Sequence, residues 1–381
     1  MSARKIAEWH AAGVIDAGTR DRLVAYEADH ARPLLLWAVF GIGALAIGLG
    51  LVSVVAANWE DIPGLVRLAV HLALIAALLW LLFVREERLA QKSPWAVEAL
   101  VFTIAVLGLT FFGHLGQVYQ TSSPMWQPLG AWLVLFAPLL LLTGRSWPTA
   151  LAVLGGAVWC AWDYAAAMSP YNARLDTPWH IWLGTVTALP VLFASLAAAL
   201  RARSQRADFW RRLEQIALAY AVAGASFACA AASAGELGRG DMAGNATRLL
   251  ASGMVAVIAG VGVAALRRDT SGAMAGAIIA GAGVAAALAV VVDDLDVAAA
   301  LLFFALWAGI GAAALVAHWR GVFQMAVGVI ALRLIILSFE LAGDLLMSGF
   351  GLILSGLMIL GVAWGAVRVS KRFAPREEGE A

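Results

Sequence analysis

Long apolar segments, separated by short polar connections, run through the chain from residue 34 to residue 369. Most are about 20 residues long, the length of α-helix that crosses a hydrocarbon core of roughly 30 Å. The pattern therefore predicts an all-α, polytopic transmembrane helix bundle of about twelve spans. The predicted spans are Leu34–Ala57, Leu65–Val84, Ala96–Phe112, Leu129–Thr143, Trp147–Ala167, Trp179–Leu200, Leu213–Ala234, Thr247–Leu266, Gly272–Val292, Val297–His318, Val322–Phe339 and Leu345–Val369.

The first 32 residues are mostly polar and predict a short cytosolic helical hairpin. Ile6 and Trp9 mark an apolar face on its first helix. Gly13 is suited to end that helix, and Asp16 is suited to cap the start of the second. A segment this small cannot bury a core of its own, so we expect it to pack against the membrane part or against a partner.

An arginine-rich connector divides the predicted spans into six and six. We therefore expect five parts: a cytosolic helical hairpin over 1–32, a first six-span membrane bundle over 33–200, a basic cytosolic connector over 201–212, a second six-span membrane bundle over 213–370, and a cytosolic tail over 371–381. Thirteen of the 16 tryptophans fall in the first 210 residues, whereas alanine and glycine dominate the second half. This shift argues against a recent internal duplication.

The composition agrees with a membrane protein: of 381 residues, 62% are hydrophobic and only 13% are charged. A net charge of +1, without a basic stripe, argues against a nucleic-acid partner. Both cysteines, Cys160 and Cys229, fall in apolar segments and read as small buried hydrophobes. The glycine patterns of the form G-x-G-x-x-A lie inside apolar spans without a preceding strand, so they indicate helix packing, and no cofactor is expected.

Basic residues are unevenly distributed between the two sides of the predicted bundle. With alternating spans, 21 of the 26 Lys and Arg fall on the side of the two termini. Cytosolic loops carry this excess in membrane proteins, so both termini are predicted to be cytosolic. The opposite loops are acidic, but the cluster Asp293-Asp294-Leu295-Asp296 lacks the spacing of a calcium loop, and no metal site is predicted.

One polar stretch, residues 113–128, interrupts the apolar pattern without any formal charge. It joins the third and fourth predicted spans on the outer side. If the helix continues through it, His114, Gln117 and Gln120 share one broad side, with Tyr119 further round. Two interpretations stay open. These side chains either satisfy backbone groups at helix ends, or they line a polar pocket at the outer mouth that binds a ligand.

Ionisable residues inside predicted spans are costly unless they pair or face water. Arg333 lies within the eleventh span, and Glu340 follows seven residues later on the same face. They complete the predicted binding set with His114, Gln117, Tyr119 and Gln120. Pairing or snorkelling is the structural alternative for Arg333 and Glu340. Glu98, Asp163, Arg67 and His71 are further buried candidates.

Three short motifs resemble a known family. They are Trp9 with Gly13-Val14-Ile15, then Ala56-Ala57-Asn58-Trp59 with Ile62-Pro63, and Gly116-Gln117-Val118-Tyr119-Gln120. In this order and spacing, residues 6–145 resemble the bacterial membrane-protein family catalogued as domain of unknown function 2157. The resemblance implies a bacterial cytoplasmic (inner) membrane setting and carries no catalytic role.

Three functions are compatible with these features. The first is transport or binding of a small molecule at a polar outer-face site, although no pair of Gly/Pro-broken helices is apparent in matching positions. The second is a scaffold or sensor that recruits protein partners through the cytosolic hairpin. The third and weakest is an intramembrane enzyme with His114 or Asp163 as general base, because the sequence shows no catalytic motif. The lipid bilayer is the expected surrounding partner.

Overall fold

A computed structural model describes residues 9–30, 62–92, 94–168, 179–235, 242–293, 295–341 and 349–373, with the single residues 6, 46 and 237. Within these residues the regular structure is helical, as predicted. The chain divides into two compact units, Met1–Arg67 and Leu68–Ala381. The first predicted span, Leu34–Ala57, lies almost wholly outside the described residues.

The N-terminal unit contains helix α2, Ala17–His30, preceded by a short helical turn. That turn ends at Gly13, which adopts a left-handed φ of 71°. The Gly13 and Val14 amides donate to the carbonyls of His10 and Trp9, the paired bonds that close a helix C-terminus. Asp16 accepts the Thr19 amide at 3.2 Å and so caps α2. Both end signals read from the sequence therefore act as helix ends.

Ten helices in the described residues are long and apolar enough to cross a membrane. The protein is thus a multi-span membrane protein, as the apolar pattern predicted. Nine of these segments lie in α4 (Gly64–Lys92), α5 (Pro94–Tyr119), α6 (Trp126–Thr143), α7 (Trp147–Ala167), α10 (Ala207–Ala232), α11 (Met242–Leu266), α12 (Thr270–Val291), α13 (Asp296–Val316) and α14 (Arg320–Leu341). The tenth, Gly184–Arg201, is built from α8 (Trp179–Ala188), the 3₁₀ turn η1 (Leu189–Leu192) and α9 (Phe193–Arg201).

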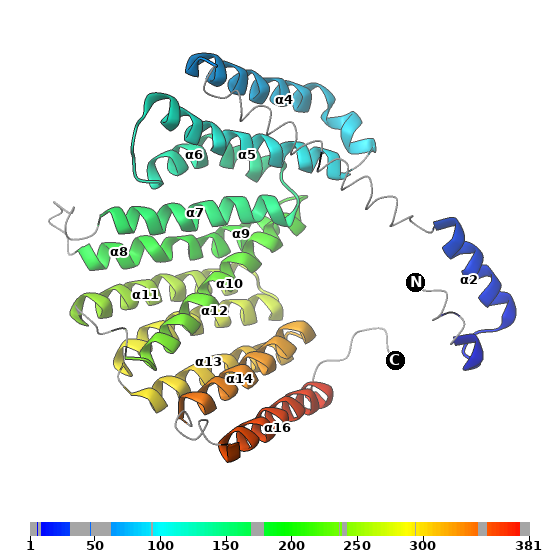
Figure 1. The fold of residues 1–381 in the computed structure, drawn as a ribbon, viewed down its shortest axis with the longest axis vertical. Coiled ribbons are helices and arrows are strands. Elements are labelled where there is room, and N and C mark those ends of the chain that lie inside the picture. The colour runs from blue at the N-terminus through cyan, green and yellow to red at the C-terminus, as the bar shows by residue number, and fades with distance from the viewer. Residues whose placement is uncertain are drawn as a thin grey trace. The chain divides into compact units, whose positions relative to one another are not determined.

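The helices of the second unit pack mostly on their neighbours in sequence (Figure 1). The contacts run from α5 to α6, α6 to α7, α7 to α8, and onward from α12 through α13 and α14 to α16, Gly349–Phe373. Helix α10 departs from this order, because it contacts α7, α9, α12 and α13. It is therefore the central helix around which the larger core forms.

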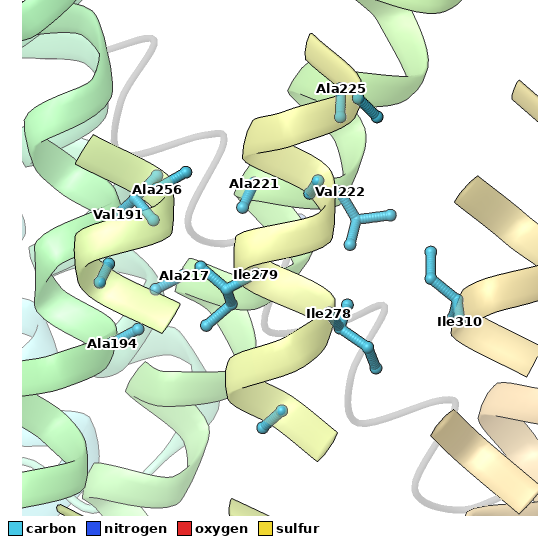
Figure 2. Close-up of a cluster of buried hydrophobic side chains, with 14 of the residues drawn as sticks. Val191, Ala194, Ala217, Ala221, Val222, Ala225, Ala256, Ile278, Ile279 and Ile310 are labelled. Carbon is cyan, nitrogen blue, oxygen red and sulfur yellow. The ribbon is translucent and has the colours of Figure 1, made fainter. Parts of the chain in front are cut away.

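The larger core is made mainly of alanine with a few branched side chains. Figure 2 shows Ala217, Ala221, Val222 and Ala225 of α10 among side chains from η1, α9, α11, α12 and α13. Small side chains let helix backbones approach closely, and lipid offers no hydrophobic force to hold helices apart or together. Close packing is therefore the main source of cohesion in this core.

Helices α11 and α12 meet along a seam of four glycines, which we call the glycine seam: Gly253, Gly260, Gly276 and Gly283. A Cβ on Gly253 would lie 2.6 Å from the Gly283 carbonyl oxygen, and the converse distance is also 2.6 Å. Gly260 and Gly276 oppose each other's backbone in the same way. Any side chain at these positions would push the two backbones apart. Gly283, which belongs to one of the G-x-G-x-x-A patterns, thus serves helix packing as the sequence indicated, whereas Gly281 and Gly309 of these patterns have nothing within 4 Å of their Cβ positions.

Charged side chains join helices at one end of this core. The buried Glu214 of α10 accepts Arg267, which follows α11, at 2.6 Å, and lies 3.5 Å from Arg201 at the end of α9. Arg267 also pairs with Asp269, which caps α12 by accepting the Gly272 amide. This cluster ties α9, α10, α11 and α12 together at the end that the arginine distribution predicts to be cytosolic.

Two helices differ from their predicted form. Helix α5 continues past Phe112 and through Gly113 and Gly116 to Tyr119, so the polar stretch begins as helix. The sixth span was predicted as one continuous helix, but it is interrupted at η1. Pro190 is the physical reason, because proline lacks the N–H that would continue the helical ladder.

Candidate functional site

The interruption at η1 borders a pocket of about 330 Å³, which we call the break pocket. It is lined by α7, α8, α10, α11 and α12. Most of the lining is apolar, from side chains such as Val191, Ala221, Phe227 and Ala256. A few polar groups join them: Trp162, Thr187, Tyr220, Arg248 and Ser252. An apolar cavity of this size with a few convergent polar groups is typical of small-molecule sites.

Side chains of neighbouring helices reach the carbonyls of α8 just before the interruption. The Tyr220 hydroxyl donates to the Thr187 carbonyl at 2.6 Å, and the Ser252 hydroxyl donates to the Gly184 carbonyl at 2.9 Å. Tyr220 in turn accepts the Trp162 indole N–H at 3.1 Å. Backbone groups freed by a break inside a membrane are tolerated only when protein or water satisfies them. These bonds therefore fix the irregular backbone beside the pocket.

Close backbone contact holds α8 against α11 at the same place. A Cβ on Gly184 would lie 2.6 Å from the Arg248 Cα. On the other side of the break, the Ser195 hydroxyl of α9 donates to the Ala259 carbonyl of α11 at 2.9 Å. Both arms of the interrupted helix are thus anchored to one neighbour, which leaves the break itself facing the pocket.

The break-pocket residues were not in the predicted binding set. Two signals in the sequence pointed toward them. Pro190 lies in the middle of an apolar span with Gly184 and two threonines just before it, and Tyr220 places a phenol near the middle of another span. Each is commonplace alone. Their convergence depends on which helices pack together, and periodicity does not report that.

The predicted polar set lies elsewhere, and the structure separates its members. His114 is buried, while Gln117, Tyr119 and Gln120 are exposed. Gln120 ends α5 in a left-handed conformation with φ of 50°, and the Thr121 amide donates back to the Gly116 carbonyl. Gln120 therefore does not continue the helical side that His114 and Gln117 would share. The binding role of these four residues stays a prediction.

His114 instead meets His71 of α4. Their Nδ1 atoms lie 3.3 Å apart, and His71 Nε2 lies 3.0 Å from the Leu107 carbonyl oxygen. A carbonyl only accepts, so with both rings neutral one tautomer pair fits both contacts: His71 Nε2–H donates to the Leu107 carbonyl, and His114 Nδ1–H donates to His71 Nδ1. This contact between the two imidazoles links α4 and α5. Their convergence was allowed by the sequence, which did not show that they meet.

Arg333 of α14 is buried and is tied to α10. Its guanidinium donates to the Ser233 hydroxyl at 2.6 Å and lies 5.9 Å from the Phe303 ring centroid. Glu340 lies in α14, but its side chain is outside the described residues. Whether Arg333 and Glu340 form a binding site stays a prediction.

Two carboxylates, the buried Glu98 and the half-buried Asp163, cap neighbouring helices at opposite ends of α5–α7. Glu98 accepts the Arg145 and Ser146 amides, both at 2.9 Å, and the Thr149 hydroxyl at 2.7 Å. Asp163 accepts the Trp126 amide at 2.7 Å at the start of α6. A carboxylate at a helix N-terminus satisfies amides that have no partner within the helix and interacts favourably with the helix dipole. Both residues thus have a structural role.

Within the described residues, no group of three or more His, Cys, Asp or Glu is arranged to hold a metal ion. Cys160 and Cys229 are free thiols, and Cys229 is fully buried among alanines. The polar groups at the break pocket are hydroxyls, an indole and a guanidinium.

Comparison with known proteins gives a family match for the N-terminal part of the chain only. No curated protein and no solved structure matches the chain. The break pocket lies beyond the segment with a family match, whereas Glu98 and the histidine pair lie within that segment. Residues 7–149 match the family described as "Predicted membrane protein (DUF2157)", which confirms the resemblance read from the sequence motifs.

Proposed function

We propose that the protein binds a small amphipathic anion, of the chemical class of a medium-chain carboxylate, in the break pocket, as a carrier or receptor for that molecule. The observation behind this proposal is the pocket itself, about 330 Å³ beside an interrupted membrane helix. Interrupted helices are typical of transporter binding sites, because backbone groups at the break and the ends of the two half-helices can contact a ligand.

The lining suggests the ligand's chemistry. Alanine, valine and phenylalanine side chains cover most of the pocket and suit an apolar body. The hydroxyls of Tyr220 and Ser252 donate their protons to the carbonyls of Thr187 and Gly184, so they hold the α8 wall of the pocket in place and leave the ligand head group to Arg248. Arg248 lines the same pocket, and a guanidinium binds a carboxylate with two parallel hydrogen bonds. An apolar tail with one anionic end fits this combination.

A panel of straight-chain carboxylates with 4 to 12 carbons would test the proposal. Thermal unfolding of the purified protein in neutral detergent is measured with each acid. We expect the unfolding temperature to rise with one range of chain lengths, because a ligand that binds only the folded state stabilises it. Arg248→Gln and Tyr220→Phe should reduce the rise, and Tyr164→Phe, whose ring packs on Trp126 outside the pocket, should retain it.

Two outcomes would contradict the proposal. One is a wild-type protein that no acid of the panel stabilises. The other is a stabilisation that Arg248→Gln and Tyr220→Phe retain at the level of Tyr164→Phe. Reconstitution of the protein into vesicles with the best-binding acid then distinguishes a carrier, which gives flux, from a receptor, which gives binding alone.

The orientation of the protein is part of the same proposal. The excess of Lys and Arg supports an inner-membrane protein with both termini in the cytosol, which puts the Arg248 end of the break pocket toward the outer face. Periplasm-active and cytosol-active reporters fused at Ser122, Arg174, Arg206 and Glu378 should report outside, outside, inside and inside. An inverted pattern would overturn this orientation.

A further inference from the structure

A second cavity lies at the other end of the helices, and we call it the head cavity. Its volume is about 630 Å³, and its polar lining includes Glu98, Arg145, Gln205, Arg206 and Arg212. It is formed where the α6–α7 connection meets the start of α10. Three arginines at one cavity make it a candidate site for an anion.

The charge of these arginines is not cancelled by nearby carboxylates. Arg206 donates to the carbonyls of Gly144, at 2.8 Å, and Leu141, and Arg212 donates to the Arg145 carbonyl. Among the described residues, no ion pair includes Arg145, Arg206 or Arg212. Burial and the charge of Arg145 lower the pKa of Arg206, which Glu98 partly offsets.

The two acidic residues of the cavity are already engaged. Glu98 is occupied by two amides and the Thr149 hydroxyl. Asp208 pairs with Arg211 at 2.9 Å. An anionic ligand would therefore meet an excess of guanidinium groups, of which those of Arg206 and Arg212 are held by backbone carbonyls.

An apolar groove of about 860 Å³, which we call the chain groove, runs along α5, α6 and α7. On α7 its lining extends from Trp147 to Trp159, and on α5 from Phe102 to Gly113. At 1.5 Å per residue these stretches are about 16 to 18 Å long. One leaflet of a hydrocarbon core is roughly 15 Å thick. The groove therefore has the length of a lipid acyl chain.

The head cavity and the chain groove adjoin along three helices. On α5, Glu98 lines the cavity and Phe102, one turn further, lines the groove. On α10, Arg212 and Ile216 repeat this relation. At the start of α7, Ser146 lines the cavity and its neighbour Trp147 lines the groove, with the Arg212 guanidinium 5.9 Å from the Trp147 ring centroid.

From this juxtaposition we infer that the head cavity and the chain groove form one binding site for an anionic phospholipid, whose phosphate lies among Arg145, Arg206 and Arg212 and whose acyl chain lies along α7. Basic pockets between membrane helices at the cytosolic side bind anionic lipid head groups. The site shares no lining residue with the break pocket, so it stands independently of the proposed carboxylate binding.

Native mass spectrometry of the detergent-purified protein, titrated with dioleoylphosphatidylglycerol, tests this inference. Dioleoylphosphatidylcholine, with the same chains and no net charge, and glycerol phosphate, which has no chains, distinguish lipid from head group. We expect phosphatidylglycerol to bind at least tenfold more tightly than either. Arg145→Gln combined with Arg212→Gln should weaken it, by about fivefold for each charge removed. Arg211→Gln, an exposed and paired arginine on the same helix, is the matched control.

A second experiment fills the chain groove with a larger side chain. A Cβ on Gly155 would meet only the Leu151 side chain, at 3.9 Å, so Gly155→Leu adds volume to the groove without a clash. It should weaken phosphatidylglycerol binding while the unfolding temperature stays close to that of the wild type. The inference is overturned if phosphatidylcholine binds as tightly, if glycerol phosphate alone does so, or if the arginine and glycine variants bind like Arg211→Gln.

Discussion

The glycine seam and the aromatic rings of α5–α7 bring helices together in different ways. We call the rings that line the chain groove, Phe102, Phe112, Trp132, Trp147 and Trp159, the aromatic layer. In the seam, backbone lies on backbone, and carbonyl oxygens occupy the places where side chains would be. In the aromatic layer, Trp132 donates its indole N–H to the Ala105 carbonyl at 2.7 Å and fills the space over Gly156. The open chain groove lies beside these rings, and Glu98 and Asp163 bind backbone amides at opposite ends of the layer.

The difference bears on where function resides. Within the seam, backbone atoms fill the space that a ligand would need, and only Gly283 of its four glycines borders the break pocket. The cavities lie at the broken helix and along the aromatic layer. Tight alanine and glycine packing around α10 thus provides a fixed frame for the less regular parts.

The largest expected effect is at the glycine seam. Gly276→Leu should lower the free energy of unfolding by about 3 kcal/mol or more, the upper end for overpacking, because the added side chain meets the α11 backbone, which cannot move aside. Denaturant titration in mixed micelles measures the change. Gly281→Leu on the same helix is the control, since nothing lies within 4 Å of its Cβ position. Equal stability of the two variants would contradict the claim that close backbone contact between α11 and α12 excludes side chains at the seam.

The next effect concerns the cap of the aromatic layer. Glu98→Ala leaves two amides and one hydroxyl without their acceptor, and we expect a loss of about 2 kcal/mol, because water from the adjoining head cavity replaces part of the bonding. The same titration measures it, with the exposed Glu87→Ala as control. A Glu98→Ala protein as stable as Glu87→Ala would mean that the carboxylate does not hold the layer together.

Two consecutive glycines of α7 sharpen the contrast inside the aromatic layer. Both glycines line the chain groove, but a Cβ on Gly156 would lie 2.9 Å from a carbon of the Trp132 ring, whereas a Cβ on Gly155 would meet only Leu151, at 3.9 Å. Gly156→Leu should therefore cost about 1 to 2 kcal/mol through forced movement of the ring. Gly155→Leu should change stability little. If Gly155→Leu lowers stability more than Gly156→Leu does, contact with the Trp132 ring is not what limits side-chain size at this point of α7.

The smallest effect is expected from pH at the end of the seam. A hydrogen bond from Arg267 holds the pKa of Asp269 below its usual value of 3.8. The stability gained from this depressed pKa is present above pH 3.8 and is lost as the pH falls through the lower pKa of the folded state. Asp269 is partly exposed, so the gain is small.

Asp269→Asn tests this pH dependence, because asparagine preserves the cap but not the charge. The difference in unfolding temperature between wild type and Asp269→Asn should be a few degrees or less at pH 6 and should shrink progressively as the pH falls below 3.8. A difference that grows on acidification would contradict the assigned sign.

Much of the fold follows from one-dimensional patterns. The positions of the spans, the helix ends at Gly13 and Asp16, and the packing role of the glycines each depend on neighbours in sequence. The continuation of α5 to Tyr119 was less accessible, because glycine and amide residues suggested an early loosening of the helix. The interruption at η1 was signalled by Pro190, yet proline occurs in unbroken membrane helices too, as Pro138 does within α6.

The sites were harder to predict than the spans, because they depend on which helices are neighbours. His114 was recognised as buried and polar, but its partner His71 is 43 residues away in sequence. Tyr220 and Thr187 come from helices joined by the connector that was expected to separate two bundles. Hydropathy indicates which segments cross the membrane and does not indicate which helices pack against each other.

Calorimetric titration with the best-binding carboxylate tests the proposed break-pocket site most directly. Gly224 lines the pocket, and nothing lies within 4 Å of its Cβ position, so the side chain of Gly224→Leu starts in open space and fills part of the pocket. We predict one saturable site in the wild type and in Gly281→Leu, and at least a tenfold loss of affinity in Gly224→Leu. Equal affinity in Gly224→Leu and wild type would contradict binding at the interrupted helix.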